Sequence, residues 1–168
     1  MATDFNKTER LMLINQYRIL SLLDLDNKEE YDQHVEILEH GFQSGYDEMV
    51  DGLDETFPEE ECHFVIGTLN MFEMIGRSIE EKNIKLPEDK KWIAQFLGFD
   101  GNGEAVYMSY SKFVIHSEGK FQRFKDLDLN SHSPCVSRYR RMLEAWEKLP
   151  VGEQCNPSEK TVLSILAA

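Results

Sequence analysis

The residue types that could support chemistry are scattered along this chain, and none of them completes a motif. Glu60 and His63 form a Glu-x-x-His pair, which is half of the ligand set of a carboxylate-bridged di-iron bundle. A complete site needs a second such pair, and none of the other four histidines follows a glutamate by three positions. Metal binding is therefore disfavoured, and we expect neither a resident metal nor another cofactor.

Residues 100–104 read Asp-Gly-Asn-Gly-Glu and resemble the opening of a calcium loop. Such a loop requires glycine at its sixth position and a bidentate glutamate at its twelfth, where this chain has Ala105 and Ser111. A phosphate-binding loop usually follows a strand and ends in a lysine or a helix start at a set spacing, and only the helix start is present here. We therefore interpret the segment as a turn between two helices.

His116, Ser117 and Glu118 are the residue types of a hydrolase triad, but they are consecutive. Consecutive residues on a helix point in different directions, so these three cannot form a triad by themselves. The Gly-x-Ser-x-Gly motif of the α/β-hydrolases does not occur in the sequence. Catalytic residues therefore stay unidentified, and enzymatic activity is disfavoured.

Residues 92–124 form an aromatic-rich block that holds eight of the eighteen aromatic residues of the chain. Each aromatic side chain buries a large apolar area, so this block is expected to anchor the core. If the protein is a small-ligand binder or an enzyme, we expect its pocket near this block. The candidate lining residues of that pocket are Tyr107, Tyr110, His116 and Arg123.

The elements that must position these residues are predicted to be helices. A capping residue followed three positions later by glutamate occurs at Asn6 and Asn27, and such pairs satisfy the free backbone donors of a helix start. Pro58 suits a first helical turn, and Gly119 suits a helix end. The expected helices cover residues 6–23, 27–44, 46–55, 58–82, 88–97 and 104–119, and two more begin near Ser133 and Asn156.

No segment predicts a convincing strand, so we expect a compact all-α single domain of about seven to eight helices over residues 1–168. The loop at residues 83–87 is the best place for a subdivision. Apolar residues wrap most of the circumference of the first helix, which predicts a central position for it. The expected core is organised around Trp92, Phe96, Tyr107, Phe113, Tyr139 and Trp146.

The net charge of −13 is concentrated in the first third of the chain. Residues 1–61 carry seventeen acidic against four basic side chains, whereas the remaining residues carry fourteen of each. This surface would repel nucleic acid, which is therefore disfavoured as a partner. Two basic patches, at residues 120–125 and 138–141, could neutralise the acidic side chains within one subunit or across subunits.

The cysteine content and the hydropathy indicate a cytoplasmic protein. Three widely spaced cysteines do not form a disulfide framework and fit a reducing compartment. The sequence has no apolar run of the roughly eighteen residues that a membrane span needs. Its first ten residues carry charges of both signs without a following apolar run, so we expect no secretory signal.

Several short motifs recur in the order and spacing of a known family. They are Arg10-Leu11, Asn15-Gln16-Tyr17, Glu39-His40-Gly41, Phe96-Leu97-Gly98-Phe99-Asp100, Tyr107-x-x-Tyr110-x-x-Phe113, Glu118-Gly119 and Arg141-Met142-Leu143 with Trp146. As a set they resemble the bacterial YfbU family. The resemblance implies an all-helical cytoplasmic bacterial protein for which an oligomer is expected. It brings no established reaction, cofactor or catalytic residue.

The function that these features favour is a non-enzymatic protein-interaction module that associates with itself. The acidic first third, the later basic patches and the lack of a coherent catalytic set all support it. The expected partners are a second copy of the chain or a basic protein. The alternative is the small-ligand binder or enzyme with its pocket near residues 92–124.

Overall fold

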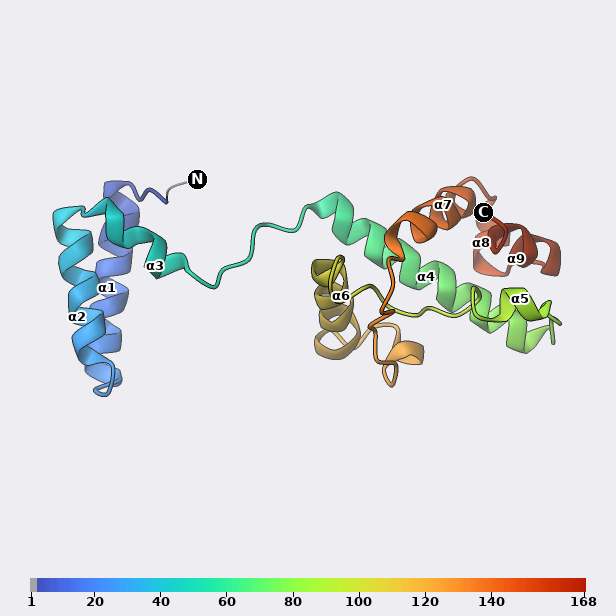
Figure 1. Cartoon of the computed structure of the whole chain (residues 1–168), viewed down its shortest axis with the longest axis horizontal. Helices are drawn as coiled ribbons and strands as arrows, with labels where there is room; N and C mark the ends of the chain where they lie inside the picture. Colours follow the sequence, from blue (N-terminus) through green and yellow to red (C-terminus); the bar gives the residue numbers. More distant parts are fainter. Residues whose placement is uncertain (1–2) are drawn as a thin grey trace. The chain divides into compact units, whose positions relative to one another are not determined.

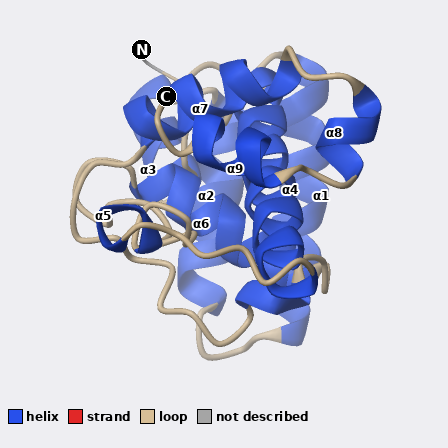
Figure 2. Cartoon of the chain, turned by 90° about the vertical axis from the view of Figure 1, so that its right-hand side faces the viewer, coloured by secondary structure: helices blue, strands red, loops and turns tan. Residues whose placement is uncertain are grey.

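The computed structural model describes residues 3–168, and these residues form an all-helical protein. They contain nine α-helices and no strand beyond one isolated bridge between Phe99 and Asn130 (Figures 1 and 2). Three of the nine helices have five residues or fewer. The all-α class and the expected number of about seven to eight helices are confirmed.

The chain folds into two compact units, and residues contact others of their own unit far more than those of the other unit. The first unit ends at residue 55, and the second covers residues 56–168. The loop at residues 83–87, where a subdivision was expected, lies inside the second unit between α4 (Glu59–Glu81) and α5 (Glu88–Lys91). The organisation of residues 1–168 as one domain stays a prediction.

The first unit is a helical hairpin followed by a short helix. It consists of α1 (Lys7–Leu23), α2 (Lys28–His40), the 3₁₀ turn η1 (Gln43–Gly45) and α3 (Tyr46–Val50). The start of α1 is as predicted, because the Asn6 side chain accepts hydrogen bonds from the amides of Thr8 and Glu9. The Asn6 amide in turn donates to Glu9 Oε2 over 2.8 Å, which completes the capping box.

The second helix differs from its predicted form at both ends. Asn27 does not cap it, since the Asn27 side chain donates instead to Asp24 Oδ2 over 3.0 Å. The helix ends at His40 rather than near residue 44, because Gly41 takes a left-handed conformation with φ of 70°. Residues 43–45 then form the 3₁₀ turn that leads into α3.

In the second unit, α4 is the element on which most of the others pack. Pro58 stands at its N-cap, and Glu59, Glu60 and Glu61 occupy the first turn, where the helix dipole favours negative charge. Helices from later in the chain contact it, namely α6 (Ala105–Lys112), α7 (Val136–Glu147), α8 (Val151–Cys155) and α9 (Glu159–Ile165). Eight residues of α4 are buried as a result.

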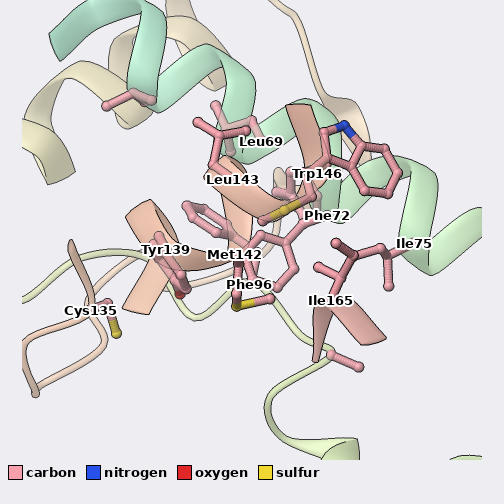
Figure 3. Close-up of a cluster of buried hydrophobic side chains, with 14 of the residues drawn as sticks. Leu69, Phe72, Ile75, Phe96, Cys135, Tyr139, Met142, Leu143, Trp146 and Ile165 are labelled. Atoms are coloured by element: carbon pink, nitrogen blue, oxygen red, sulfur yellow. The ribbon is translucent and has the colours of Figure 1, made fainter. Parts of the chain in front are cut away.

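The core of the second unit combines α4, α7 and α9 with the segment around Phe96. Figure 3 shows Phe72, Phe96, Met142 and Ile165 among the side chains gathered there. Of the predicted core residues, Phe96, Tyr139 and Trp146 are buried and Tyr107 is partly buried. A single cluster of buried apolar side chains therefore holds this unit together.

Two of the predicted core residues were wrong: Trp92 is 51% exposed and Phe113 is 49% exposed. The helix expected over residues 88–97 ends at Lys91, and Trp92 follows it outside the core. The guanidinium of Arg138 lies over the Trp92 ring, with Cζ 4.9 Å from the ring centroid. Phe113 begins the π-helical turn η2 (Phe113–Ser117), which widens the helix there. Its ring stacks on Tyr110 at the surface.

The glycine-rich segment at residues 100–104 is a turn, as interpreted, and its glutamate has a structural function. The buried carboxylate of Glu104 accepts hydrogen bonds from the amides of Cys135, Val136 and Asp100, over 2.8–3.1 Å. Glu104 therefore caps the start of α7 from a distant part of the chain, and the helix begins at Val136, with Cys135 at its N-cap, rather than at Ser133.

Beside this cap, residues 98–99 lie close to the backbone of residue 129. Gly98 has φ of 85°, and a Cβ added to it would lie 2.0 Å from the Leu129 carbonyl oxygen. The Phe99 amide donates to this same oxygen over 3.1 Å. Only glycine can occupy position 98, because any side chain would separate the two segments.

We predict that Glu104→Gln lowers the stability of the protein. Glutamine keeps one acceptor oxygen but places an amide donor against the backbone donors of α7, so at least one buried amide loses its partner. The free energy of unfolding is expected to fall by about 1–3 kcal/mol. Urea denaturation followed by circular dichroism measures the change.

The matched control is Glu144→Gln, because Glu144 is an exposed glutamate of α7 that pairs only with Lys148. Exposed pairs of this kind contribute little to stability. Equal losses of stability in the two variants would contradict the capping function of Glu104.

Candidate functional site

The most extensive exposed apolar surface of the first unit lies on α1. We define the α1 stripe as Leu11, Met12, Ile19, Leu22 and Leu23, each of which is more than half exposed. At about 100° per residue, these five side chains project within an arc of roughly 120°. The buried residues Ile14 and Ser21 lie on the opposite side of the helix. The central position predicted for the first helix is therefore not what the structure has within this unit.

The polar side chains of α1 that contact α2 lie away from the α1 stripe. Arg10 Nη1 donates to the Leu38 carbonyl oxygen over 3.1 Å, and Arg18 pairs with Glu39. Ser21 donates to Asp32 Oδ1 over 2.9 Å. The charged side chains of α1 lie outside the arc of the stripe, which therefore presents apolar and uncharged polar side chains.

The acidic side chains of the first unit are concentrated outside α1. Residues 28–40 carry five acidic side chains against one lysine, whereas residues 7–23 carry one acidic side chain against three basic ones. Within α2, hydrogen bonds from Lys28 and Ser21 lower the pKa of Asp32, so this carboxylate stays ionised. The α1 stripe therefore lies on the least acidic helix of the unit.

The basic patches predicted from the sequence are largely engaged within the second unit. Arg140 pairs with Glu61, and Arg123 pairs through two nitrogens with Glu80. Lys120 pairs with Glu118 over 2.9 Å. Among these acidic partners only Glu61 belongs to the acidic first third of the chain. Neutralisation of the remaining acidic side chains, within one subunit or across subunits, stays a prediction.

Two of the four predicted pocket residues, Tyr107 and Tyr110, belong to one aromatic cluster. Both contact Phe57, with ring centroids 5.2 and 5.5 Å away. The Tyr107 hydroxyl donates to Glu61 Oε2 over 2.8 Å. Burial, and then this hydrogen bond, raise the pKa of Tyr107, so its hydroxyl stays protonated and acts as a donor.

The other two predicted residues, His116 and Arg123, lie elsewhere. His116 is exposed on η2. Arg123, at the 3₁₀ turn η3 (Gln122–Phe124), lies against α4 and lines a cavity of about 390 Å³ beside Phe96 and Phe124. Among the four candidates, only Arg123 lines this cavity, and a pocket assembled from all four stays a prediction.

Between residues 3 and 168, no three His, Cys, Asp or Glu side chains come together as a metal-binding group. The Glu60 and His63 pair gains no further ligand there, and His63 lies 3.9 Å from the exposed carboxylate of Glu59. None of the helices in this part of the chain has the length and hydropathy needed to cross a bilayer.

Sequence reasoning missed Gly76 and misread the α1 stripe. Gly76 lies inside the 23-residue helix α4, and a glycine within a helical pattern could have indicated a close approach, which the structure shows to be that of Arg123. The apolar residues around α1 were interpreted as core residues of a central helix. A helix that is apolar on two faces can also present one of these faces to a partner.

Comparison with known proteins gives matches over the whole described length. The model of the YfbU domain matches residues 3–168. The UPF0304 protein MJECS11 of Methanocaldococcus jannaschii is 36% identical over 172 aligned residues. That alignment covers 97% of this chain and 99% of the relative, so both units share in the similarity.

We predict that Arg123→Gln raises the pKa of Glu80. Hydrogen bonds from Arg123, and then its charge, hold the pKa of Glu80 below its ordinary value in the folded protein. The stability that this pair contributes is present above the ordinary pKa of glutamate and is lost as the pH falls through the lowered value. Carboxyl titration by ¹³C NMR measures the pKa in both proteins.

Glu144 provides the internal reference in the same spectra, because Lys148 lowers its pKa at a distant position. We expect the Glu144 titration to be identical in the wild type and the variant. An unchanged titration of Glu80 in the variant would show that Arg123 does not hold this carboxylate.

Proposed function

Because the chain belongs to the YfbU family, we propose a function for it as a member of that family, namely a self-associating protein-interaction module. The family match confirms the resemblance predicted from the sequence. The contact surface between two copies in this proposal is the α1 stripe. The observation that carries it is the outward exposure of five large apolar side chains on one face of one helix.

The exposed area of the α1 stripe supports contact with another protein. Leu22 and Leu23 are 76% and 77% exposed, and Leu20 and Leu25 extend the apolar surface at the flanks. A standard protein interface covers roughly 800 Å² on each partner, and large apolar side chains exposed on one helix can provide the apolar part of such a surface. Monomeric proteins rarely leave such a continuous apolar patch in water.

The distribution of charge supports a second copy of the chain as the occupant. Two copies of an acidic protein repel each other wherever their acidic surfaces meet. The α1 stripe is uncharged, and α2 contacts α1 on the side that carries the buried Ser21, which donates to Asp32. Figure 1 shows the two helices side by side in the hairpin. Pairing through the stripe therefore keeps the two α2 surfaces apart while it buries apolar side chains.

The order of residues in the stripe suits a two-fold symmetric, antiparallel pairing. Leu11 and Met12 lie at one end of the stripe, and Leu22 and Leu23 lie at the other. When two copies of α1 run in opposite directions about residue 17, the first pair of one helix meets the second pair of the other. A closed two-fold contact of this kind is the commonest form of self-association.

We also propose that residues 1–168 act as one domain and that the protein works in the cytoplasm. The match of a single family model over residues 3–168 supports the first statement. The three cysteines are free, as in proteins of a reducing compartment, which supports the second. The acidic surface of α2 stays available for a basic protein partner in this arrangement.

We predict that the protein forms dimers through the α1 stripe and that Ile19→Glu weakens them by at least about 100-fold. A glutamate at the centre of the stripe would place an unpaired charge in an apolar interface. Sedimentation velocity over a range of protein concentrations measures the dissociation constant. Circular dichroism checks that the variant keeps its helices.

The control variant is Leu53→Glu, because Leu53 is also 77% exposed but lies beyond α3 and outside the stripe. Its dissociation constant should equal that of the wild type. Added salt should leave the association intact or strengthen it, whereas charge pairing would weaken with salt. A monomer at every concentration and ionic strength, or an Ile19→Glu variant that dimerises normally, would refute the proposal.

A further inference from the structure

A hollow of about 370 Å³ lies at the start of α1, next to the α1 stripe. Its lining comes from one short stretch of the first unit, and it includes Met12 of the stripe. The other lining residues are Asp4, Phe5, Glu9, Leu13 and Gln16. Side chains that fill pockets of a partner carry much of the binding energy of protein interfaces, so the group that fills this hollow matters for the self-association.

The apolar part of this hollow is fixed on one side and adaptable on the other. Phe5 and Leu13 are partly buried and pack against the buried side chains of the first unit. The ring of Phe5 lies on that of Tyr46, with 4.9 Å between the centroids. Met12, by contrast, is 56% exposed, and a methionine side chain is flexible enough to adapt to the group that enters.

The rim of the hollow is polar. The carboxylate of Glu9 accepts a hydrogen bond from the Asn6 amide over 2.8 Å, so the capping box holds it at the start of the helix. Asp4 and Gln16 also line the hollow and are exposed. An apolar centre inside a polar rim is the usual arrangement of a protein interface, and the two carboxylates of this rim repel an acidic group. The hollow therefore suits an uncharged apolar side chain.

A second copy of the chain carries such a side chain at the other end of its own α1. Leu23 is 77% exposed, although leucine is among the residues that are most often buried. Its charged neighbour Asp24 accepts hydrogen bonds from Asn27 Nδ2 and from the Tyr31 hydroxyl of α2, over 3.0 and 2.9 Å. Leu23 can therefore enter an apolar site while the Asp24 carboxylate stays engaged within its own hairpin.

The antiparallel pairing about residue 17 brings Leu23 level with the hollow. Leu23 lies six residues after the centre of the pairing, because 23 − 17 = 6. It is therefore level with residue 11 of the other copy, which lies six residues before the centre, because 17 − 11 = 6. The part of the lining that belongs to α1 comes from residues 9–16, so it includes that level.

The same pairing also places Leu23 on the correct side of the helix. At about 100° per residue, Met12, Leu23 and Gln16 lie about 20°, 40° and 60° from Ile19 in the same direction around α1. A two-fold axis perpendicular to the plane of the two helices keeps this side of one copy next to the same side of the other. Leu23 of one copy therefore faces the hollow of the other.

We propose that the hollow at the start of α1 binds Leu23 of a second copy of the chain, and that two such insertions stabilise the dimer. This inference rests on the proposed self-association and adds the contact that sets its direction and register. In a parallel pairing, Leu23 would lie beside Leu23 of the other copy and the two hollows would lie beside each other, so both hollows would stay unfilled.

The test combines two variants of the full chain that each damage one side of this contact. Met12→Trp fills the hollow, and Leu23→Ala removes the side chain that enters it. Both positions are more than half exposed, so each variant is expected to fold, which circular dichroism checks. Sedimentation velocity should show that each variant alone dimerises at least roughly tenfold more weakly than the wild type.

An equimolar mixture of the two variants should restore the dimer. In the mixed pair, Leu23 of the Met12→Trp copy enters the intact hollow of the Leu23→Ala copy, and the filled hollow meets an alanine. We therefore expect mixed dimers to outnumber both kinds of uniform dimer, as measured by native mass spectrometry. A random or smaller share of mixed dimers, or a Met12→Trp variant that dimerises as tightly as the wild type, would overturn the proposal.

The matched control is Leu53→Ala, because Leu53 is exposed to the same 77% as Leu23 but lies outside the stripe. It should dimerise like the wild type, and in a mixture with Met12→Trp it should pair mainly with itself. Failure of the mixed pair while Ile19→Glu still abolishes the dimer would refute only the insertion of Leu23. A wild type that stays monomeric would refute the self-association as well.

Discussion

Burial of the apolar side of α4 is the interaction on which the second unit depends. Val65, Leu69, Met71 and Ile75 are fully buried, and four later helices pack on this one element. Packing at its surface is close, since a Cβ added to Gly67 would lie 3.1 Å from Cδ2 of Leu143 on α7. The surface of this single helix therefore positions most of the later helices of the second unit.

Polar contacts provide the precision that apolar burial cannot supply. Hydrophobic attraction has no direction, so it does not decide where the loop at residues 98–104 meets residues 129–136. The Glu104 carboxylate and the backbone hydrogen bond from Phe99 to Leu129 fix that meeting point. The cavity lined by Arg123 and the start of α7 both lie next to this contact between the two segments. Their geometry therefore depends on a few buried hydrogen bonds.

The sequence predicted those features of the fold that depend on neighbouring residues. The capping box at Asn6, the helix start after Pro58 and the helix end near Gly119 follow from local backbone chemistry, and the structure has all three. The surface position of Trp92 and the cap supplied by Glu104 could not be predicted, because their partners Arg138 and Cys135 lie about thirty or more residues away. Local propensity is weak where tertiary contacts compete with it.

The candidate sites were harder to predict than the fold, for the same reason. Arg123 was singled out because it lies near the aromatic block, but its place at the cavity depends on Gly76 of another helix. The apolar residues of α1 were recognised, yet the pattern alone does not say whether a partner or the chain itself covers them. Exposed surfaces and cavities depend on how elements pack together. Apolar periodicity predicts which face of a helix makes contacts, but it does not predict which element or partner that face contacts.

Among residues 3–55, the first unit buries three apolar side chains, namely Ile14, Leu38 and Tyr46. A helical segment of this length with so small an interior is only marginally stable by itself. Covering its outer face would thus supply part of the free energy that keeps it ordered, and folding and assembly would form a single coupled equilibrium. The concentration of the protein in the cell would then help to determine which fraction of the first unit is folded. A change in the expression of the gene would change that fraction.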